Sequence, residues 1–198
     1  MARRSDHTRE ELKELAIVAG QKIISNEGLS NFSARKVAKE MGYTVGTLYN
    51  IFRDYNDLVL HINLATLDDM HNYISERFKS ADQVTDTIKK LAALYIRFAN
   101  ENYHRWSALF AFTLPQNTPL PDGYSDKIKA LFSLIEAPLL LLMRKNKKDA
   151  ERAAKVIWAS IHGLCQLGLT GKLNTIGAEP IEVLTDTLID NFIRGLES

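Results

Sequence analysis

Hydrogen-bonding side chains are concentrated in the short segment 44–50 of this chain. They are Thr44, Thr47, Tyr49 and Asn50. Leu48 and Phe52 have the i, i+4 spacing of an inward helix face, so the polar side chains would lie on the outward face and leading edge. Hydroxyl and amide groups presented in this way suit contacts with the phosphates and base edges of DNA.

The elements that would position this face are two short helices joined by a tight turn. Ser33 and Thr44 are suited to cap them, because a hydroxyl accepts one of the unpaired N–H groups of a first turn. Gly42 stands where the first helix needs a residue that tolerates positive φ. This is the helix-turn-helix plan, whose second helix enters the DNA major groove. The alternative is an ordinary helical hairpin that binds nothing.

The flanking sequence favours a DNA-binding unit over such a hairpin. Residues 8–27 carry the apolar stripe of a longer amphipathic helix, with Thr8 and Glu11 at capping-box spacing and Gly28 as a natural end. Another helix is expected to begin at Tyr55. Three helices followed directly by a long helix form a more specific pattern than a hairpin alone.

The N-terminal part of the chain, to about residue 60, resembles the TetR family of bacterial transcriptional repressors. The matching segments are 33–38 (Ser-Ala-Arg-Lys-Val-Ala), Met41-Gly42, 46–52 (Gly-Thr-Leu-Tyr-Asn-Ile-Phe) and Asp57-Leu58. Where the family has a lysine after this motif, the chain has Tyr55. A phenol donates to a phosphate but carries no charge, so this contact should be weaker.

The resemblance implies two domains. Residues 1–54 would form the helix-turn-helix DNA-binding domain, and residues 55–198 a helical ligand-binding and dimerisation domain. Double-stranded DNA is the expected partner of the first domain. The residues assigned to DNA contact are Ser33, Ala34, Arg35, Thr44, Val45, Gly46, Thr47, Tyr49, Asn50 and Tyr55.

The charge of the chain is consistent with DNA binding but does not demand it. The net charge is only +1, so no strong basic field marks a nucleic-acid partner. Several positive side chains nevertheless stand where they could reach phosphates beside a major groove. They are Arg3, Arg4, Arg35, Lys36 and Arg53. For the first two, a solvated N-terminal tail is the alternative.

The remainder of the sequence indicates helices, so the predicted fold class is all-α. No proline occurs before Pro115, and no β-branched alternation persists. Three prolines and a glycine make 115–123 a loop, whereas Pro138 falls inside a helical pattern. The expected helices after the DNA-binding unit are Tyr55–Ser80, Asp82–Asn102, Tyr103–Leu114, Tyr124–Lys145, Asp149–Lys172 and Pro180–Gly195.

This larger region is rich in aromatic residues and methionines. Helical bundles build ligand pockets from such side chains, although most of them would be simple core residues. By resemblance to the TetR family, the region should hold a small-molecule inducer of unknown identity. The residues assigned to its pocket are Leu67, Met70, Ile74, Tyr95, Phe98, Trp106, Phe110 and Met143.

The last two expected helices carry features of a homodimer interface. Apolar residues recur at helical spacing in both, and Ala153, Ile157, Ile161, Leu164 and Gly168 form a stripe in the first. Trp158, His162 and Gly163 form a W-x-x-x-H-G pattern, which resembles a TetR subgroup that uses this helix for dimerisation. A core helix with a hydrogen-bonded histidine is the compatible alternative. The assigned interface residues are Trp158, His162, Gly163, Gly168, Leu184, Leu188 and Phe192.

Other functional classes find little support. We expect no enzyme, catalytic residue, metal or cofactor, because no phosphate-binding loop, metalloprotease motif or nucleophile elbow occurs. Asp68 and His71 could share a metal, but no second ligand cluster follows. A helical protein-interaction adaptor is the main alternative, with a metal-dependent enzyme less favoured. A single apolar-flanked cysteine, Cys165, and the lack of a signal peptide or membrane-length run favour a cytoplasmic protein without membrane contact.

Together these observations predict a ligand-responsive transcriptional regulator. It would bind a palindromic operator as a homodimer and be released by its inducer. Repression is favoured by the resemblance, but the sequence leaves activation open, and it names neither operator nor inducer.

Overall fold

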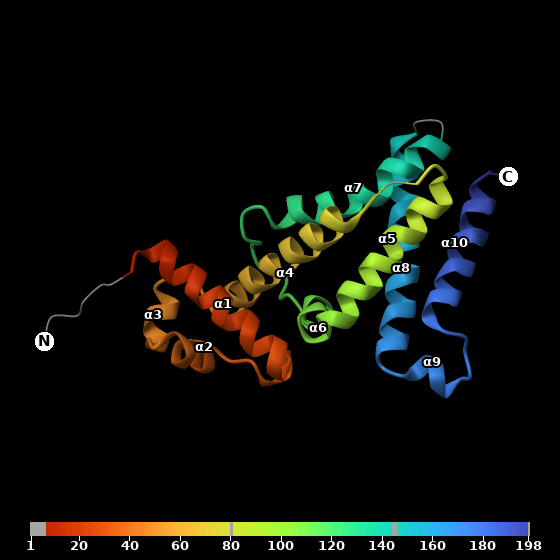
Figure 1. Ribbon diagram of the computed structural model, residues 1–198. Helices are drawn as coiled ribbons and strands as arrows, with labels where there is room; N and C mark the ends of the chain where they lie inside the picture. The colour runs from red at the N-terminus through yellow and green to blue at the C-terminus, as the bar shows by residue number, and fades with distance from the viewer. Residues whose placement is uncertain (1–6, 80, 144–145, 198) are drawn as a thin grey trace, which may run out of the picture. The chain divides into compact units, whose positions relative to one another are not determined.

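The computed structural model describes residues 7–79, 81–143 and 146–197, and all of its regular structure there is helical (Figure 1). This confirms the predicted all-α fold class. Arg3 and Arg4, expected on an N-terminal arm, lie outside the described residues. The elements are α1 (Arg9–Glu27), the 3₁₀ turn η1 (Leu29–Asn31), α2 (Ala34–Met41), α3 (Val45–Tyr49), α4 (Tyr55–Arg77), α5 (Val84–Glu101), α6 (Tyr103–Ala111), α7 (Tyr124–Leu142), α8 (Lys147–Leu169), α9 (Lys172–Thr175) and α10 (Ile181–Glu197).

The predicted caps of the N-terminal helices are present. Thr8 and Glu11 form a reciprocal capping box, and the hydroxyls of Ser33 and Thr44 accept the N–H groups of the third residues of α2 and α3. Gly42 ends α2 in the left-handed conformation, at φ 75° and ψ 23°. These four side chains and one glycine therefore fix where the first three helices begin and end.

The chain forms two compact units. The first contains residues up to Asp69 together with Asn102–Ser125, and the second contains Met70–Glu101 together with the residues from Asp126 onward. Helix α4 contributes residues to both.

In the first unit, α1 packs on α2 and α6 around an apolar core. Gly20 permits a close approach between α1 and α4, because a Cβ atom there would collide with the buried Ile62 side chain. The core also takes Ala108 from α6. Its largest fully buried members from the helix-turn-helix segment and α4 are Val37, Leu48, Phe52, Leu58 and Ile62.

In the second unit, α10 packs against α5 and α8 (Figure 1). It buries Thr185, Ile189 and Ile193 there. Helix α8 buries its own stripe, which includes Ala153, Ile157, Ile161 and Cys165. Helix α7 contains Pro138 within its length, as expected, and buries only Leu139 among its described residues.

The helix ends depart from prediction by a few residues. Helix α8 begins two residues early, because the Asn146 side chain accepts the Asp149 N–H as an N-cap. The short η1 and α9 were not predicted, since three or four residues are too few to show a helical period. Across the residues that the structure describes, no helix combines the length and the apolar character needed to cross a lipid bilayer.

Candidate functional site

The recognition helix α3 buries one side chain and exposes most of the others. Leu48 is fully buried, whereas Thr44, Gly46, Tyr49 and Asn50 are exposed, with Tyr49 at 46%. The predicted outward residues Val45 and Thr47 are half-buried, and the Thr47 hydroxyl lies 3.0 Å from that of Thr44. The exposed set therefore offers a phenol, an amide and a hydroxyl on one short helix and its cap.

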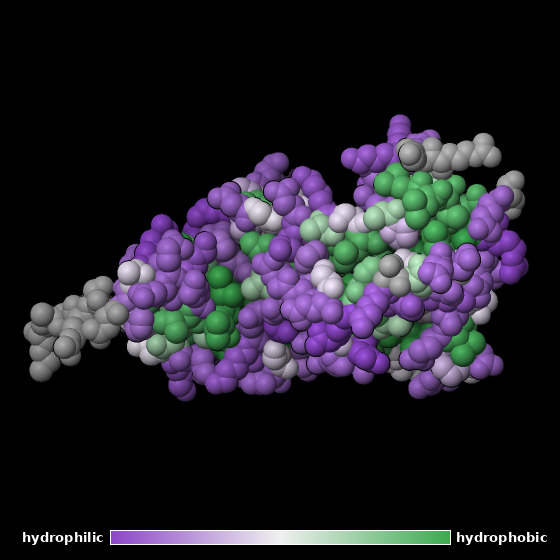
Figure 2. All heavy atoms as spheres, turned by 45° about the horizontal axis from the view of Figure 1, so that its top comes forward, coloured by the Kyte–Doolittle hydropathy of each residue, from purple (hydrophilic) through white to green (hydrophobic). Residues whose placement is uncertain are grey.

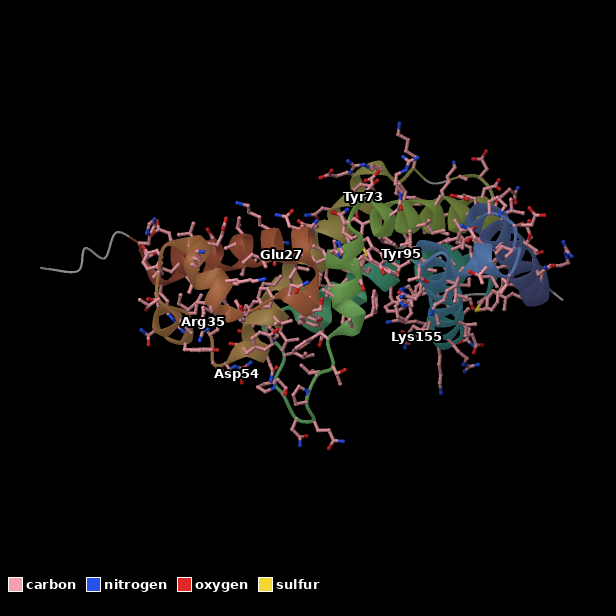
Figure 3. All side chains as sticks on the ribbon, turned by 90° about the horizontal axis from the view of Figure 1, so that it is seen from below. Glu27, Arg35, Asp54, Tyr73, Tyr95 and Lys155 are labelled. Carbon is pink, nitrogen blue, oxygen red and sulfur yellow. The ribbon has the colours of Figure 1, made fainter. Side chains whose placement is uncertain are left out.

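The start of α2 lies in the same unit and adds one unpaired positive charge. Arg35, which is labelled in Figure 3, is exposed and has no ion-pair partner among the described residues. Its neighbour Ala34 has a buried side chain, so only the backbone of Ala34 could contact a ligand. The Ser33 hydroxyl is half-buried and accepts the Lys36 N–H at 3.3 Å.

Two of the positive side chains expected near phosphates are engaged within the protein. Lys36 donates to Glu27 at 2.5 Å and to the Asn31 carbonyl at 2.8 Å. Arg53 donates to Asp57 at 2.8 Å and to the Pro119 carbonyl at 2.9 Å. Neither group is therefore as available to a phosphate as Arg35.

Tyr55, which replaces the family's lysine, serves the core as well as the surface. Its ring packs against Phe32 with centroids 5.8 Å apart, and its side chain is half-buried. Burial and the nearby Tyr49 both raise the pKa of Tyr55, so its hydroxyl stays protonated and can donate a hydrogen bond at neutral pH. The two phenols thus belong to one rim of the first unit.

The junction between α3 and α4 is a hydrogen-bonded network around Asp57. This buried carboxylate accepts hydrogen bonds from the Arg53 backbone N–H at 2.9 Å and from the Arg53 guanidinium. The Asp57 backbone N–H in turn donates to the Asp54 carboxylate at 2.8 Å. His61 lies 3.5 Å from the Asp57 carboxylate. Burial alone would raise the pKa of Asp57, but the hydrogen bonds from Arg53 and the nearby His61 outweigh it and lower the pKa.

The residues assigned to an inducer pocket fall in both units. Leu67 and Trp106 are buried in the first unit, where Phe110 is 41% exposed and contacts the Trp106 ring. The remaining members belong to the second unit. Met143 is half-buried there, and the buried ones are Met70, Ile74, Tyr95 and Phe98.

A polar pair lies among the apolar side chains of the second unit. The Tyr95 hydroxyl and His162 Nδ1 are 2.9 Å apart, and the His162 ring stacks on Trp158 at 5.5 Å between centroids. Trp158 also meets Phe132 edge to face at 5.4 Å. Figure 3 shows Tyr95 lying among the helices of this unit. The sequence pattern identified Trp158 and His162, but it did not reveal their partners on α5 and α7.

We expect the stability of the second unit to fall in mild acid because of His162. Burial lowers the pKa of this imidazole below its ordinary 6.5, so the folded state resists protonation that the unfolded chain accepts. Stability is therefore greatest above pH 6.5 and declines as the pH falls toward the folded-state pKa. Urea unfolding at several values between about pH 7.5 and 5.5 measures this, with His162→Gln as the variant that loses part of the slope. Equal slopes in both proteins would contradict it.

The residues assigned to a dimer interface are half-buried in the protomer. A Cβ atom at Gly163 would meet no described atom within 4 Å. Val156, seven residues before it on α8, and Leu167, four residues after it, are both exposed. Gly168 differs, because a Cβ atom there would lie 3.1 Å from Ile181 of the same chain. The close packing at Gly168 is therefore within the protomer, although the residue was assigned to the dimer interface. Leu184, Leu188 and Phe192 flank the inward stripe of α10.

The prediction that the apolar stripe of α8 faces a second protomer was wrong in part. Ala153, Ile157 and Ile161 are buried within their own unit, because α5 and α10 cover this face. The face left outside is the one through Val156, Gly163 and Leu167. Figure 2 shows apolar surface among polar side chains over the second unit, in the right-hand half of the view.

Asp68 and His71, weighed above as metal ligands, gain no further ligand. Among the described residues, no group of three or more histidine, cysteine or acidic side chains could hold a metal ion. Burial raises the pKa of Cys165 to about 12, so this thiol is unreactive at neutral pH.

Comparison with known proteins agrees with this architecture. The family model described as tetracyclin repressor-like, C-terminal domain, matches residues 88–192, just over half of the chain. The HTH-type transcriptional regulator Rv0681 of Mycobacterium tuberculosis is 24% identical over 193 residues, which cover 96% of this chain and 82% of Rv0681.

Two solved structures share the fold at low identity. RolR in complex with resorcinol superposes with a TM-score of 0.68 at 15% identity, covering 96% of this chain and 94% of RolR. BioQ with its double-stranded DNA operator gives 0.62 at 17% identity, covering 94% and 98% of the two chains. The matched family and the relative Rv0681 are transcriptional regulators rather than enzymes. The chain belongs to the tetracycline repressor-like (TetR) family of transcriptional regulators.

Proposed function

We propose that the protein binds a palindromic operator as a homodimer and is released by a small-molecule inducer. Residues 1–54 would read the DNA, and residues 55–198 would bind the inducer and the second protomer. The observation that carries the proposal is the capped helix α3, which exposes Thr44, Tyr49 and Asn50 while Leu48 anchors it. A two-fold dimer would present two such helices to successive major grooves.

Operator binding can be tested without knowing the operator. Repeated selection from a random duplex library should enrich an inverted repeat whose half-sites are about one helical turn apart. Fluorescence anisotropy with the enriched duplex, measured across a salt series, should then give affinity that falls as salt rises. Failure to enrich any sequence, with a folded dimer present, would count against the proposal and favour the helical adaptor.

We expect Arg35→Ala to weaken operator binding by about 1–3 kcal/mol and to relax preference at one base pair of each half-site. Arg35 is exposed and unpaired among the described residues, so its guanidinium is available for the O6 and N7 atoms of guanine. Affinities for single-base operator variants measure this. Tyr49→Phe is the comparison, since loss of a phosphate-bound hydroxyl should weaken all operators alike. A uniform loss in Arg35→Ala would assign Arg35 to phosphate contact.

The inducer part of the proposal rests on the interior of the second unit. RolR, in its structure, holds resorcinol, and inducer binding is what the family resemblance implies. In this chain, Met70, Ile74 and Phe98 are buried in the same unit as a polar pair, Tyr95 and His162, which could orient a ligand. Release from DNA would require the ligand to prefer one conformer by about 1–3 kcal/mol.

Helix α4 is the proposed route from ligand to DNA. Its first residues, including Leu58 and Ile62, belong to the core of the first unit, whereas Met70 and Ile74 belong to the second. A ligand that shifts the second part would therefore act on a helix that also forms the core behind α3.

A further inference from the structure

An open pocket in the second unit is lined by none of the residues assigned to DNA, inducer or dimer contacts. It has a volume of about 380 Å³ and is formed by residues at the end of α4 and in the middle of α5. This volume lies in the range that accommodates a small molecule. Four positive side chains line it: Arg77, Lys79, Lys90 and Arg97.

The rest of the lining is apolar. Phe78 projects from the segment after α4, and Ala93 and Leu94 come from α5. Among the described residues, no carboxylate lines the pocket. The four cationic side chains are exposed and form the rim of the pocket, whereas Phe78 and Leu94 are half-buried and form its apolar floor.

The positive charge of the rim is largely uncompensated. Lys79, Lys90 and Arg97 have no ion-pair partner within the part of the chain that the structure describes. Arg77 is positioned by the Tyr73 ring, 4.1 Å below its guanidinium, and donates to the Tyr73 carbonyl at 3.3 Å. Its one carboxylate neighbour, Glu76, lies at 3.5 Å and is 72% exposed. Four cations around one opening repel each other, and an anion would relieve that repulsion.

We propose that this pocket binds a small anionic amphiphile, with a phosphate, carboxylate or sulfonate group at the cationic rim. Its apolar body would lie on Phe78 and Leu94. A simple anion would gain little from exposed, hydrated cations alone. Burial of an apolar body adds the larger contribution, and the charges then select for anionic ligands. The site shares no lining residue with the proposed inducer pocket, and the proposal does not depend on DNA binding.

The test is a fluorescence titration of the full-length protein with anilinonaphthalenesulfonate, an anionic aromatic amphiphile. We expect saturable binding that is about tenfold weaker in the double variant Lys90→Gln/Arg97→Gln. The matched control Lys147→Gln/Lys155→Gln removes two charges from α8 of the same unit and should bind like the parent protein. The uncharged phenylnaphthylamine should bind both double variants equally.

Competition with unlabelled ligands identifies the chemical class that the pocket binds. Displacement of the dye by octyl phosphate or octanoate supports the proposal, and their relative strength identifies the preferred headgroup. Displacement by inorganic phosphate at the same concentration would assign the pocket to simple anions and overturn the amphiphile. Sedimentation with phosphatidylglycerol vesicles that is lost in Lys90→Gln/Arg97→Gln would assign the rim to a membrane surface instead. Unchanged dye binding in that variant, with an intact fold by circular dichroism, would also overturn the proposal.

Discussion

Gly163→Arg should convert the protein to a monomer that binds operator DNA at least about a hundredfold more weakly. In a dimer, binding of the first recognition helix raises the effective concentration of the second at its half-site, which increases operator affinity by about a hundredfold or more. A monomer loses this increase. Gly163 is suited to the test because a Cβ atom there would meet no described atom of the protomer within 4 Å. Arginine also favours helix more than glycine does, so α8 should remain intact. In a dimer formed through the Val156–Leu167 face, its long charged stem would separate the helices.

Sedimentation velocity gives the oligomeric state, and anisotropy with the selected operator gives the affinity. The control is Ser133→Arg, which places the same side chain at an exposed position of α7, outside the proposed interface. It should remain dimeric and bind DNA normally. A Gly163→Arg protein that stays dimeric would place the interface elsewhere. Gly168→Arg cannot decide the question, because its side chain would collide with Ile181 of its own chain.

The helix-turn-helix segment was predictable because its signals are local. A cap hydroxyl acts on an N–H group three residues away, and Gly42 adopts the left-handed conformation for reasons contained in one residue. The inward positions Leu48 and Phe52 also follow from spacing alone, and both are almost fully buried. Local chemistry therefore determined where these helices begin, where they end and which face is buried.

Tertiary partners were not predictable in the same way. Helix α8 has two apolar faces, and its periodicity could not tell that Ile157 and Ile161 would face α5 and α10 while Val156 would remain exposed. The ion pair that engages Lys36 depends on Glu27, nine residues away across a turn. Ala108 of α6 enters the core of the first unit although 46 residues separate it from Ile62. Such contacts are set by packing between elements rather than by spacing within one.

Asp57→Ala should lower the free energy of unfolding of the first unit by about 2–3 kcal/mol, because it removes the acceptor of two hydrogen bonds at a buried position. One comes from the Arg53 N–H and the other from its guanidinium. The carboxylate also lies in the first turn of α4, where a negative charge interacts favourably with the helix N-terminus. Without the Asp57 carboxylate, the segment between α3 and α4 loses its hydrogen bonds to α4. The Arg53 guanidinium then keeps only its hydrogen bond to the Pro119 carbonyl.

The two tryptophans allow this loss to be assigned to one unit. Trp106 belongs to the first unit and Trp158 to the second, so a Trp158→Phe background leaves Trp106 fluorescence as the reporter of urea unfolding. Asp57→Asn is the matched variant: it keeps the shape and one acceptor oxygen, loses the charge, and should fall between the parent protein and Asp57→Ala.

The pH dependence gives an independent check on the same carboxylate. The pKa of Asp57 in the folded state lies below its ordinary 3.8, so its stabilisation is fully present above that value and is lost as the pH falls through the folded-state pKa. The difference between parent and Asp57→Ala should therefore be constant from about pH 5 to 8 and shrink in stronger acid. A stability difference between the parent protein and Asp57→Ala that is already small at neutral pH would show that the Arg53–Asp57 contact does not hold α3 against α4. The route proposed from α4 to the recognition helix would then need another contact.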